Sequence, residues 1–409
     1  MAPTKQTILN DPIYGFISIK DDLILKLLDH PYLQRLGRIK QLGLTHLVYP
    51  GAYHTRLQHA VGVAHLMGTA IEVLRAKDNK ITDDEELAVK LAILLHDIGH
   101  GPYSHVLENT IVSNVTHEDL SDLFMERLNE EFNGKLDLAI KIFENKYRKK
   151  FLHQLVSSQL DMDRLDYLKR DSFFTGVAEG AISSDRIIKT LNVVKDKLVI
   201  DAKGIYSVEN FLIARRLMYW QVYLHKTVIS AEYLLIKILE RAKELVRGGA
   251  TLFATPALEY FLQVQPGKSV FVKDRAALDT FAKLDDYDIL TSVKVWAQQE
   301  EPVLKRLSTN LVNRNLYQIE LSDNKFKKGK IDKLLGQTAK KFKISEKEAR
   351  YFVFTDVIGN SAYDKHSPKI NILYRDGRLE DIAKASDQLN ISVLSKRVEK
   401  HFLCYPKQI

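Results

Sequence analysis

The chain is poor in several features that would place it in a specialised class of protein. Its single cysteine, Cys404, excludes a disulfide within the chain and fits a reducing compartment. The longest apolar runs are too short to span a bilayer, and residues 1–6 lack the apolar segment of a secretory signal. No Walker loop, dinucleotide fingerprint or internal repeat is present. We therefore expect a cytoplasmic protein without a membrane partner.

The remaining composition is that of an ordinary globular protein with one basic region. Apolar residues make up 45% and charged residues 27% of 409 residues, which is enough for a large core. Residues 325–350 contain ten Lys/Arg and three Asp/Glu, so they carry +7 of the formal net charge of +8. Such a run is most often a solvated face, and contact with phosphate or nucleic acid stays open as an alternative.

The central feature of the sequence is an adjacent His96 and Asp97 at the end of an apolar helix. Leucines and isoleucines recur at three- and four-residue spacing over residues 87–98, and Gly99, Gly101 and Pro102 then end the helix. An imidazole and a carboxylate side by side suit a borderline divalent metal such as Mn, Fe or Zn. The sequence therefore predicts half of a metal site here.

Two other segments offer further ligands. His59 lies in the first turns of a predicted helix over residues 54–74, and Arg56 lies three positions earlier on the same face. In residues 161–171, Asp163, Tyr167 and Asp171 step by four and share a face. A ligand from each segment would complete a site with two histidines and two aspartates.

Further polar and aromatic residues suggest chemistry around such a site. His105 precedes Glu108 by three positions, and a histidine with a carboxylate can transfer protons near neutral pH; a helix-terminal acid is the alternative. A long helical pattern over residues 204–239 places Arg215, Tyr219 and Tyr223 on one side. That stripe could bind a polyphosphate and a sugar or base, or belong to the core.

The order of elements predicts a mostly α-helical fold. One helix is expected from Pro31 through Leu42, and more amphipathic helix over residues 284–315. Strand-like segments occur at residues 16–19 and again at 352–355, 369–374 and 391–394, with Asp376-Gly377 as a turn. We expect a helical catalytic core over residues 1–320 and a basic segment with a small α/β lobe over residues 321–409.

Linked motifs then resemble a known family. They are NDPIYG (residues 10–15), YPGAYHTRLQH (49–59), HDIGHGPYSH (96–105), THE (116–118), DRLDY (163–167) and YLHK (223–226). Together they resemble the HD-domain phosphohydrolases. The resemblance is closer to the dNTP triphosphohydrolases typified by the SAM- and HD-domain enzyme, without the SAM domain. It covers nearly the whole chain and implies the HD-domain helical core.

The resemblance also implies roles for individual residues. The implied metal ligands are His59, His96, Asp97 and Asp163. The implied catalytic residues are His105, His117 and, in the place of the family's aspartate, Glu108. The implied substrate contacts are Arg56, Arg164, Arg215 and Tyr223 for phosphates, with Tyr167, Asp171, Gln41 and Leu42 near the sugar.

The implied reaction is hydrolysis of a dNTP to deoxynucleoside and inorganic triphosphate, with one divalent transition metal and possibly Mg on the nucleotide phosphates. A nucleotide activator and a dimer or tetramer are also implied. Gly37 stands where activated members carry an arginine that reads a guanine. Two alternatives remain: an HD phosphohydrolase acting on another nucleotide or phosphate ester, and a nucleotide-sensing or nucleic-acid-binding module.

Overall fold

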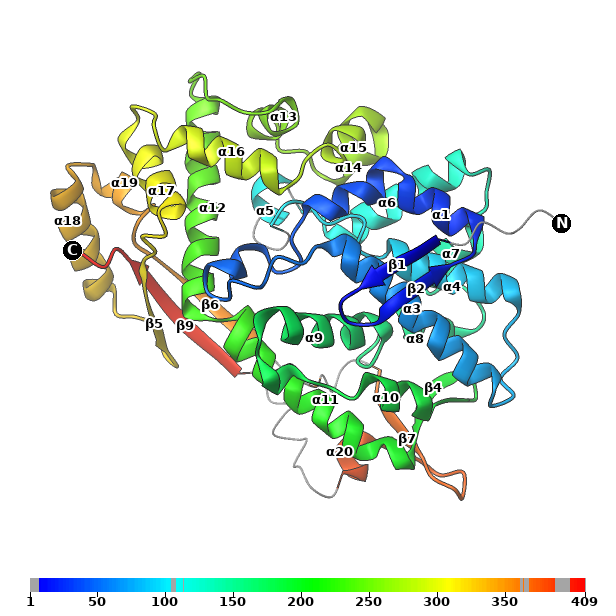
Figure 1. Cartoon of the computed structure of the whole chain (residues 1–409). Coiled ribbons are helices and arrows are strands. Elements are labelled where there is room, and N and C mark those ends of the chain that lie inside the picture. Colours follow the sequence, from blue (N-terminus) through cyan, green and yellow to red (C-terminus); the bar gives the residue numbers. More distant parts are fainter. Residues whose placement is uncertain are drawn as a thin grey trace.

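The structure is a computed structural model of the 409-residue chain. It describes residues 7–103, 108–112, 114–360, 363, 368–386 and 398–408, without the side chains of residues 108, 109 and 360. Helices dominate these residues, and three small sheets lie among them (Figure 1). The mostly α fold with a small α/β part is thus confirmed. Within the described part of the chain, no helix combines the length and apolarity needed to cross a membrane.

The chain begins with a hairpin of β1 (Thr7–Asp11) and β2 (Gly15–Ile19), which confirms the strand expected at residues 16–19. Asp11 pairs with Gly15 across its end, and Gly15 takes φ 72°, a conformation that glycine adopts without strain. The Asp11 carboxylate accepts hydrogen bonds from the backbone N–H groups of Ile13 and Tyr14. The turn is therefore fixed by the side chain of Asp11.

The segment after the hairpin is more broken than the sequence pattern predicts. It contains α1 (Asp22–Asp29), α2 (Pro31–Gln34) and the 3₁₀ turns η1 (Arg35–Arg38) and η2 (Gly43–Leu47). The single helix expected from Pro31 to Leu42 is therefore wrong. Ile39 is extended, and the flanking Lys40 bridges to Thr55. Gly43 then takes φ 49°. The apolar positions still face the core, but from separate turns.

Three helices form the framework of the site. α3 (Arg56–Arg75) packs against both α4 (Asp83–Leu95) and α9 (Met162–Thr175). Capping boxes begin α3 at Thr55 and α4 at Thr82, so two backbone N–H groups at the start of each helix have partners. The sequence prediction that a helix ends at His96 is confirmed, because His96 is the C-cap of α4.

Five further helices follow in the described first half of the chain. They are α5 (Glu108–Ile111), α6 (His117–Glu131), α7 (Asp137–Phe143), α8 (Lys150–Val156) and α10 (Ser184–Thr190), with 3₁₀ turns at η4 (Ala178–Gly180) and η5 (Ala202–Gly204). α4 packs on α7 and α8, so the helix that leads to His96 is covered along its length.

The long helix expected over residues 204–239 is divided. It consists of α11 (Ile205–Met218), one π-helical turn, η6 (Tyr219–Tyr223), and α12 (Lys226–Arg247). His225 is extended, and its side chain accepts the N–H of Thr227 as the N-cap of α12. The break turns the chain, so that α12 runs across the molecule from the end of α11 (Figure 1). Periodicity alone did not reveal this interruption.

The second half of the chain adds helices and completes two sheets. Its helices are α13 (Pro256–Gln263), α14 (Lys268–Lys273), α15 (Arg275–Phe281), α16 (Asp286–Trp296), α17 (Pro302–Val312), α18 (Lys328–Phe342), α19 (Glu346–Ala349) and α20 (Ile382–Ala385). One sheet has the order β5 (Gln318–Ser322), β9 (Val398–Tyr405), β6 (Phe354–Asn360). The other has the order β3 (Leu191–Val194), β4 (Lys197–Asp201), β7 (Asn371–Leu373), β8 (Leu379–Asp381).

The strands near the C-terminus therefore divide between two places. β7 pairs in parallel with β4, whereas β6 and β9 pair with each other next to β5. The turn at Asp376-Gly377 is confirmed, since it joins β7 to β8 and Gly377 takes φ 84°. The strand expected at residues 391–394 lies outside the described residues, and the domain boundary at residue 320 remains a prediction.

Candidate active site

Ends of the three framework helices meet at one point. His59 lies in the first turns of α3, His96 caps the end of α4, and Asp163 lies in the first turn of α9. The Asp163 Oδ1 atom is 3.1 Å from Nε2 of His59 and 3.5 Å from Nε2 of His96. These ligand-type atoms all lie within 4.8 Å of one another, a spacing at which they could hold one metal ion.

The two imidazoles are oriented for ligation. Nδ1 of His96 lies 2.6 Å from the carbonyl oxygen of Ile93, so this nitrogen must carry the proton. Nδ1 of His59 lies 2.7 Å from the carboxylate of Asp166 and donates in the same way. Both Nε2 atoms are buried without a hydrogen-bond partner and face the Asp163 carboxylate. The residues present thus fit a divalent cation, because the two Nε2 atoms would otherwise be buried without a hydrogen-bond partner.

Asp97 lies at the edge of the same cluster. Its Oδ1 atom is 3.3 Å from Nε2 of His96, and its Oδ2 atom is 3.8 Å from Nε2 of His59. Arg56 donates to Oδ2 at 2.5 Å. Burial by itself would raise the pKa of Asp97, but the charges of His96, His100 and Arg56 outweigh burial and hold the pKa well below the usual carboxyl range. Asp97 is therefore a carboxylate, as ligation requires.

The charges around this point favour a cation. Among the described residues, the buried carboxylates of Asp11, Asp97 and Asp166 and the half-buried carboxylate of Asp163 form direct ion pairs with two guanidinium groups, those of Arg56 and Arg170, and otherwise with histidines. Burial lowers the pKa of His59, yet the neighbouring carboxylates of Asp163 and Asp166 raise it overall to about 10. A proton is thus attracted to Nε2 of His59, and a divalent ion would compete for the same position.

A second pair of histidines lies beside the cluster. The rings of His100 and His117 stack at 4.0 Å with an interplanar angle of 15°, and Nε2 of His100 is 3.3 Å from Asp97. Burial and the charge of Arg56 hold the pKa of His100 well below its usual range. A Cβ atom on Gly99 would lie 2.1 Å from the carbonyl oxygen of His117, so only glycine allows this approach. His105 and the side chain of Glu108 lie outside the described residues.

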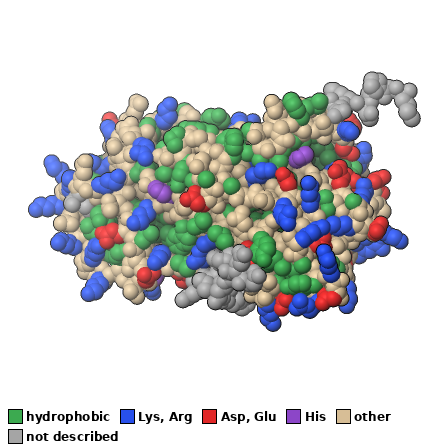
Figure 2. All heavy atoms as spheres, turned by 60° about the horizontal axis from the view of Figure 1, so that its bottom comes forward, with side chains coloured by type: hydrophobic (Ala, Val, Ile, Leu, Met, Phe, Trp, Pro, Cys, Tyr) green, Lys and Arg blue, Asp and Glu red, His purple; other side chains and the backbone are tan. Residues whose placement is uncertain are grey.

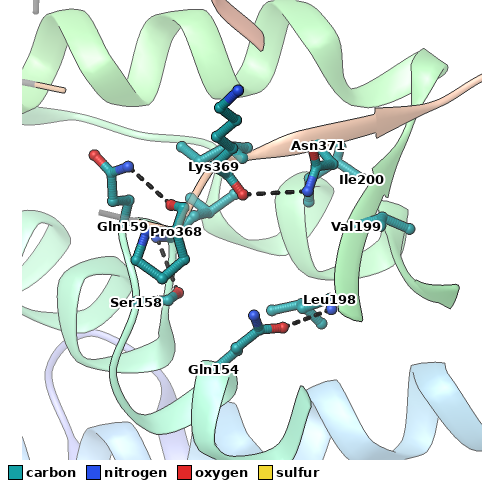
Figure 3. A pocket seen from close by; sticks show the side chains of 11 residues that line it. Gln154, Ser158, Gln159, Leu198, Val199, Ile200, Pro368, Lys369 and Asn371 are labelled. Atoms are coloured by element: carbon teal, nitrogen blue, oxygen red, sulfur yellow. Dashed lines mark hydrogen bonds between the residues drawn. The ribbon is translucent and has the colours of Figure 1, made fainter. Parts of the chain in front are cut away.

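The turn before α9 is tied to distant parts of the chain. Buried Asp161 caps α9 and accepts from the backbone and the guanidinium of Arg164, which fixes that arginine beside Asp163. Gln159 donates to the carbonyl of Pro368, and the side chains around a small cavity show how this loop meets β4 and β7 (Figure 3). The loop that leads into α9 and Arg164 is therefore in contact with the C-terminal region.

The remaining face of α9 meets the aromatic stripe after α11. The carboxylate of Asp171 accepts from the hydroxyl of Tyr223 at 2.7 Å and contacts Nε2 of His54 at 2.7 Å. The Tyr223 ring lies edge-on to the rings of Tyr167, at 6.2 Å, and Tyr219, at 5.0 Å. The π-helical turn thus still brings these tyrosines together, although the helix expected there is interrupted.

The other predicted residues lie next to this group. The guanidinium of Arg215 is 5.9 Å from the centre of the Tyr219 ring. The backbone N–H of Gln41 donates to the carbonyl of His54, while its side-chain oxygen is buried without a hydrogen-bond partner. Leu42 follows it and is half-buried. The predicted residues that the structure describes thus form a metal-type cluster, an arginine and tyrosine group, and a loop linked to that group through His54.

Sequence reasoning missed four residues that contribute to this geometry: His54, His100, Asp166 and Arg170. Asp166 and Arg170 occur in the same aspartate-rich segment as Asp163. Their spacing of four gave the pairing, but nothing in the local sequence showed that this pair is buried. The only local signal for His54 is its place in the sequence, five positions before His59.

Comparison with known proteins gives independent matches over the same regions. A model described as HD domain matches residues 56–171, and one described as HD associated region matches residues 182–250. The Bacillus subtilis protein YwfO is 31% identical, covering 99% of this chain and 93% of its own length. A SAMHD1 homologue of Dictyostelium discoideum, named a deoxynucleoside triphosphate triphosphohydrolase, is 27% identical over 76% of this chain and 59% of its own length.

The solved structures include a similar protein of nearly equal length. A phosphohydrolase from Bacteroides thetaiotaomicron has 54% sequence identity and a TM-score of 0.95, covering 98% of this chain and all of that one. The HD model begins at Arg56 and ends at Asp171, so its limits enclose all three residues of the metal-type cluster.

Proposed function

Because this chain belongs to the HD-domain phosphohydrolases, we propose that it hydrolyses dNTPs to deoxynucleoside and inorganic triphosphate. The observation that carries the proposal is the pair of buried, unpartnered imidazole Nε2 atoms facing Asp163, with arginines beside them. A Dictyostelium discoideum relative named as a dNTP triphosphohydrolase supports the substrate class.

In this proposal His59, His96, Asp97 and Asp163 hold one divalent transition metal, of which Mn, Fe and Zn suit mixed nitrogen and oxygen ligands. The metal, when bound, would polarise a phosphoryl oxygen and lower the pKa of a ligated water. Arg56 keeps Asp97 ionised through their short hydrogen bond, so the carboxylate is ready to bind a cation. Mg on the nucleotide phosphates is compatible with this arrangement.

Arginines supply the positive charge that a triphosphate needs. Arg164 is held by Asp161 at the start of α9, directly after the ligand Asp163. Arg215 projects from α11 against the Tyr219 ring. A guanidinium fork can form two parallel hydrogen bonds with phosphate oxygens, and its fixed position avoids an ordering cost when substrate binds.

The sugar would lie against the Asp171 group. Both oxygens of this carboxylate already contact the protein, through His54 and Tyr223, and each still has a lone pair for a 3′-hydroxyl. Tyr167 would contact the sugar ring, while Gln41 and Leu42 would leave no room for a 2′-hydroxyl. Discrimination between dNTPs and rNTPs would thus arise from a rigid, hydrogen-bonded pocket rather than from the metal.

Proton transfer to the leaving oxygen is assigned to the histidine side of the cluster. His117 begins α6 and stacks on His100, whose Nε2 atom is next to Asp97. We propose that His117 acts with His105 and Glu108 in protonation. A cytoplasmic location, a nucleotide activator and a dimeric or tetrameric assembly are part of the same proposal.

The test is a product assay on protein stripped of metal and then reloaded separately with Mn, Fe or Zn. Each dNTP and rNTP is offered alone and in mixtures, and the products are separated. We expect triphosphate and deoxynucleoside from dNTPs only, with loss of activity after chelation. Asp97→Asn should reduce turnover at least about a thousandfold, since it removes a ligand charge.

Asp84→Asn is the matched control, because Asp84 is an exposed carboxylate in the first turn of α4, at the opposite end of that helix from His96. It should keep wild-type turnover. Full activity in Asp97→Asn would refute the metal mechanism. Hydrolysis of a different phosphate ester, with dNTPs untouched, would keep the metal mechanism and replace the substrate.

A further inference from the structure

A chain of buried charges connects the metal cluster to the N-terminal hairpin. Arg170 on α9 donates from Nε and Nη2 to the two oxygens of Asp166, at 2.9 and 3.0 Å. Its third nitrogen, Nη1, donates to Oδ2 of Asp11 at 2.9 Å. Asp166 in turn accepts from Nδ1 of His59 at 2.7 Å. None of the four side chains belongs to a residue more than 6% exposed.

Helix α3, which packs against α9, leaves room for these buried charges at Gly62. A Cβ atom on Gly62 of α3 would lie 2.2 Å from Nη2 of Arg170 and 2.3 Å from Oδ1 of Asp166. Those distances are shorter than any real contact, so only glycine lets the ion pair lie against α3. Gly62 is three residues after His59, and therefore both residues face α9.

Asp11, at the hairpin end of these hydrogen bonds, is also held in place. Asp11 uses its other oxygen, Oδ1, to accept the backbone N–H groups of Ile13 and Tyr14, which shape the turn between β1 and β2. The guanidinium of Arg170 lies 5.7 Å from the centre of the Tyr14 ring. One carboxylate thus joins the geometry of the hairpin turn to the orientation of Arg170.

The two histidines of the cluster differ in their support. Nδ1 of His96 donates to a carbonyl within the same helix, that of Ile93, so its orientation is local. His59 instead depends on Asp166, whose position is set by Arg170 and then by Asp11. The carboxylate at Nδ1 of a ligating histidine fixes the ring and increases the basicity of Nε2.

We propose that Asp166, Arg170 and Asp11 are positioning residues for His59, and that the N-terminal hairpin is thereby a structural part of the metal centre. This inference rests on the metal site of the proposed function. It assigns the hairpin a role that does not require contact with substrate, metal or any other ligand. A change at the hairpin turn should consequently alter how tightly the cluster holds a metal.

Three substitutions probe successive links. Asp166→Asn removes the charge next to His59. Arg170→Lys keeps the positive charge, but an ammonium group cannot bridge two carboxylates in the geometry of a guanidinium. Asp11→Asn can retain the turn through its amide oxygen, while its amide nitrogen would oppose the donor Nη1 of Arg170.

Glu85→Gln is the matched control for loss of a buried carboxylate. Glu85 is 2% exposed and binds Lys149 and Tyr147, but it lies near the start of α4, about 16 Å along the helix from His96. Its replacement should lower stability without changing the metal cluster.

The experiment titrates metal-free full-length protein with Co²⁺ alone and follows the visible absorption of the bound ion. Circular dichroism and the unfolding midpoint of the metal-free protein establish that each variant is folded. We expect Asp166→Asn and Arg170→Lys to weaken Co²⁺ binding by about 10- to 100-fold, with a changed absorption spectrum. Asp11→Asn, one link further away, should weaken it by about three- to tenfold.

The outcomes separate the possible failures. Folded Arg170→Lys and Asp11→Asn proteins with wild-type affinity and spectrum would overturn the proposal, as would an equal loss of affinity in Glu85→Gln. If Asp166→Asn does not fold, the other two variants decide. Wild-type protein that binds no Co²⁺ would refute the metal centre itself, whereas tight binding without dNTP hydrolysis would refute only the substrate and leave the positioning role in place.

Discussion

Two charged regions of this protein follow opposite physical rules. Around the metal-type cluster, Asp166 and Arg170 are fully buried and every partner atom has a defined position. On α18, lysines lie in solvent, and blue side chains crowd the corresponding end of the surface in Figure 2. A buried charge without its partner costs several kcal/mol, whereas an exposed one costs little. Charge in the first region therefore specifies geometry, while charge in the second sets surface potential.

The strongest test of this contrast is a substitution that adds a methyl group and leaves every charge in place. Gly62→Ala should lower the free energy of unfolding by about 3 kcal/mol, because the new Cβ atom would displace the Asp166–Arg170 pair. Metal affinity should fall with it. Denaturant unfolding and a metal titration measure both effects.

Gly68→Ala, in the same helix, is the control. There the added Cβ atom meets only the flexible end of Lys90, at 3.0 Å, and alanine is the better helix former by about 0.5–1 kcal/mol. Equal behaviour of the two variants would show that the buried pair tolerates displacement and would remove the contrast.

An intermediate effect is expected from the acidic surface of α6. Burial and the charges of Glu144, Glu126 and Asp119 raise the pKa of Asp122 from 3.8 to about 6. The folded state thus binds this proton more tightly than the unfolded state. Ionisation of Asp122 therefore lowers the free energy of unfolding: the loss is absent below pH 3.8 and grows until the pH exceeds 6. Asp122→Asn should stabilise the protein above pH 6 by on the order of 1 kcal/mol, reduced by solvent screening, and should have no effect at pH 3.5.

Asp119, three residues earlier, has the opposite effect on stability, because its pKa is lowered rather than raised. Its hydrogen bond to Lys268 lowers its pKa, so its contribution to stability is present at neutral pH and is lost as the pH falls. Asp119→Asn should therefore destabilise the protein at pH 7. Thermal unfolding of both variants across pH checks the two signs, and a shared sign would contradict the assignment.

The smallest effect should come from the basic helix. Replacing exposed Lys328, Lys333 and Lys340 by glutamine should change the free energy of unfolding by less than about 0.5 kcal/mol per site. Metal content and dNTP turnover should stay at wild-type values. A large loss of activity would mean that this surface contributes to the site, and salt-sensitive nucleic-acid binding lost in the triple variant would support the alternative of a nucleic-acid contact.

The sequence predicts those parts of the site that depend on local order. Apolar spacing predicts that a helix ends at His96, and the four-residue steps predict that Asp163 and Asp171 share a face of α9. The helical fold class follows from the same patterns. These features are set within one or two turns of the chain, where periodicity is informative.

Partners that meet across the fold cannot be inferred in this way. The role of Asp11 depends on Arg170, which is 159 positions away, and a buried aspartate and a solvated one look alike in sequence. The interruptions at Ile39 and at residues 219–225 also escape periodicity, since the apolar residues continue through both breaks. Tertiary packing decides these points.

The pairing of β4 with β7 bears on how the protein is made. A ribosome adds about 5–20 residues per second, so β7 emerges roughly 10–30 s after β4, and the edge of β4 has no partner in the interval. The bond from Gln159 to the carbonyl of Pro368, which steadies the turn before Asp163, forms equally late. During synthesis, the nascent chain is thus exposed to edge-to-edge association for many seconds.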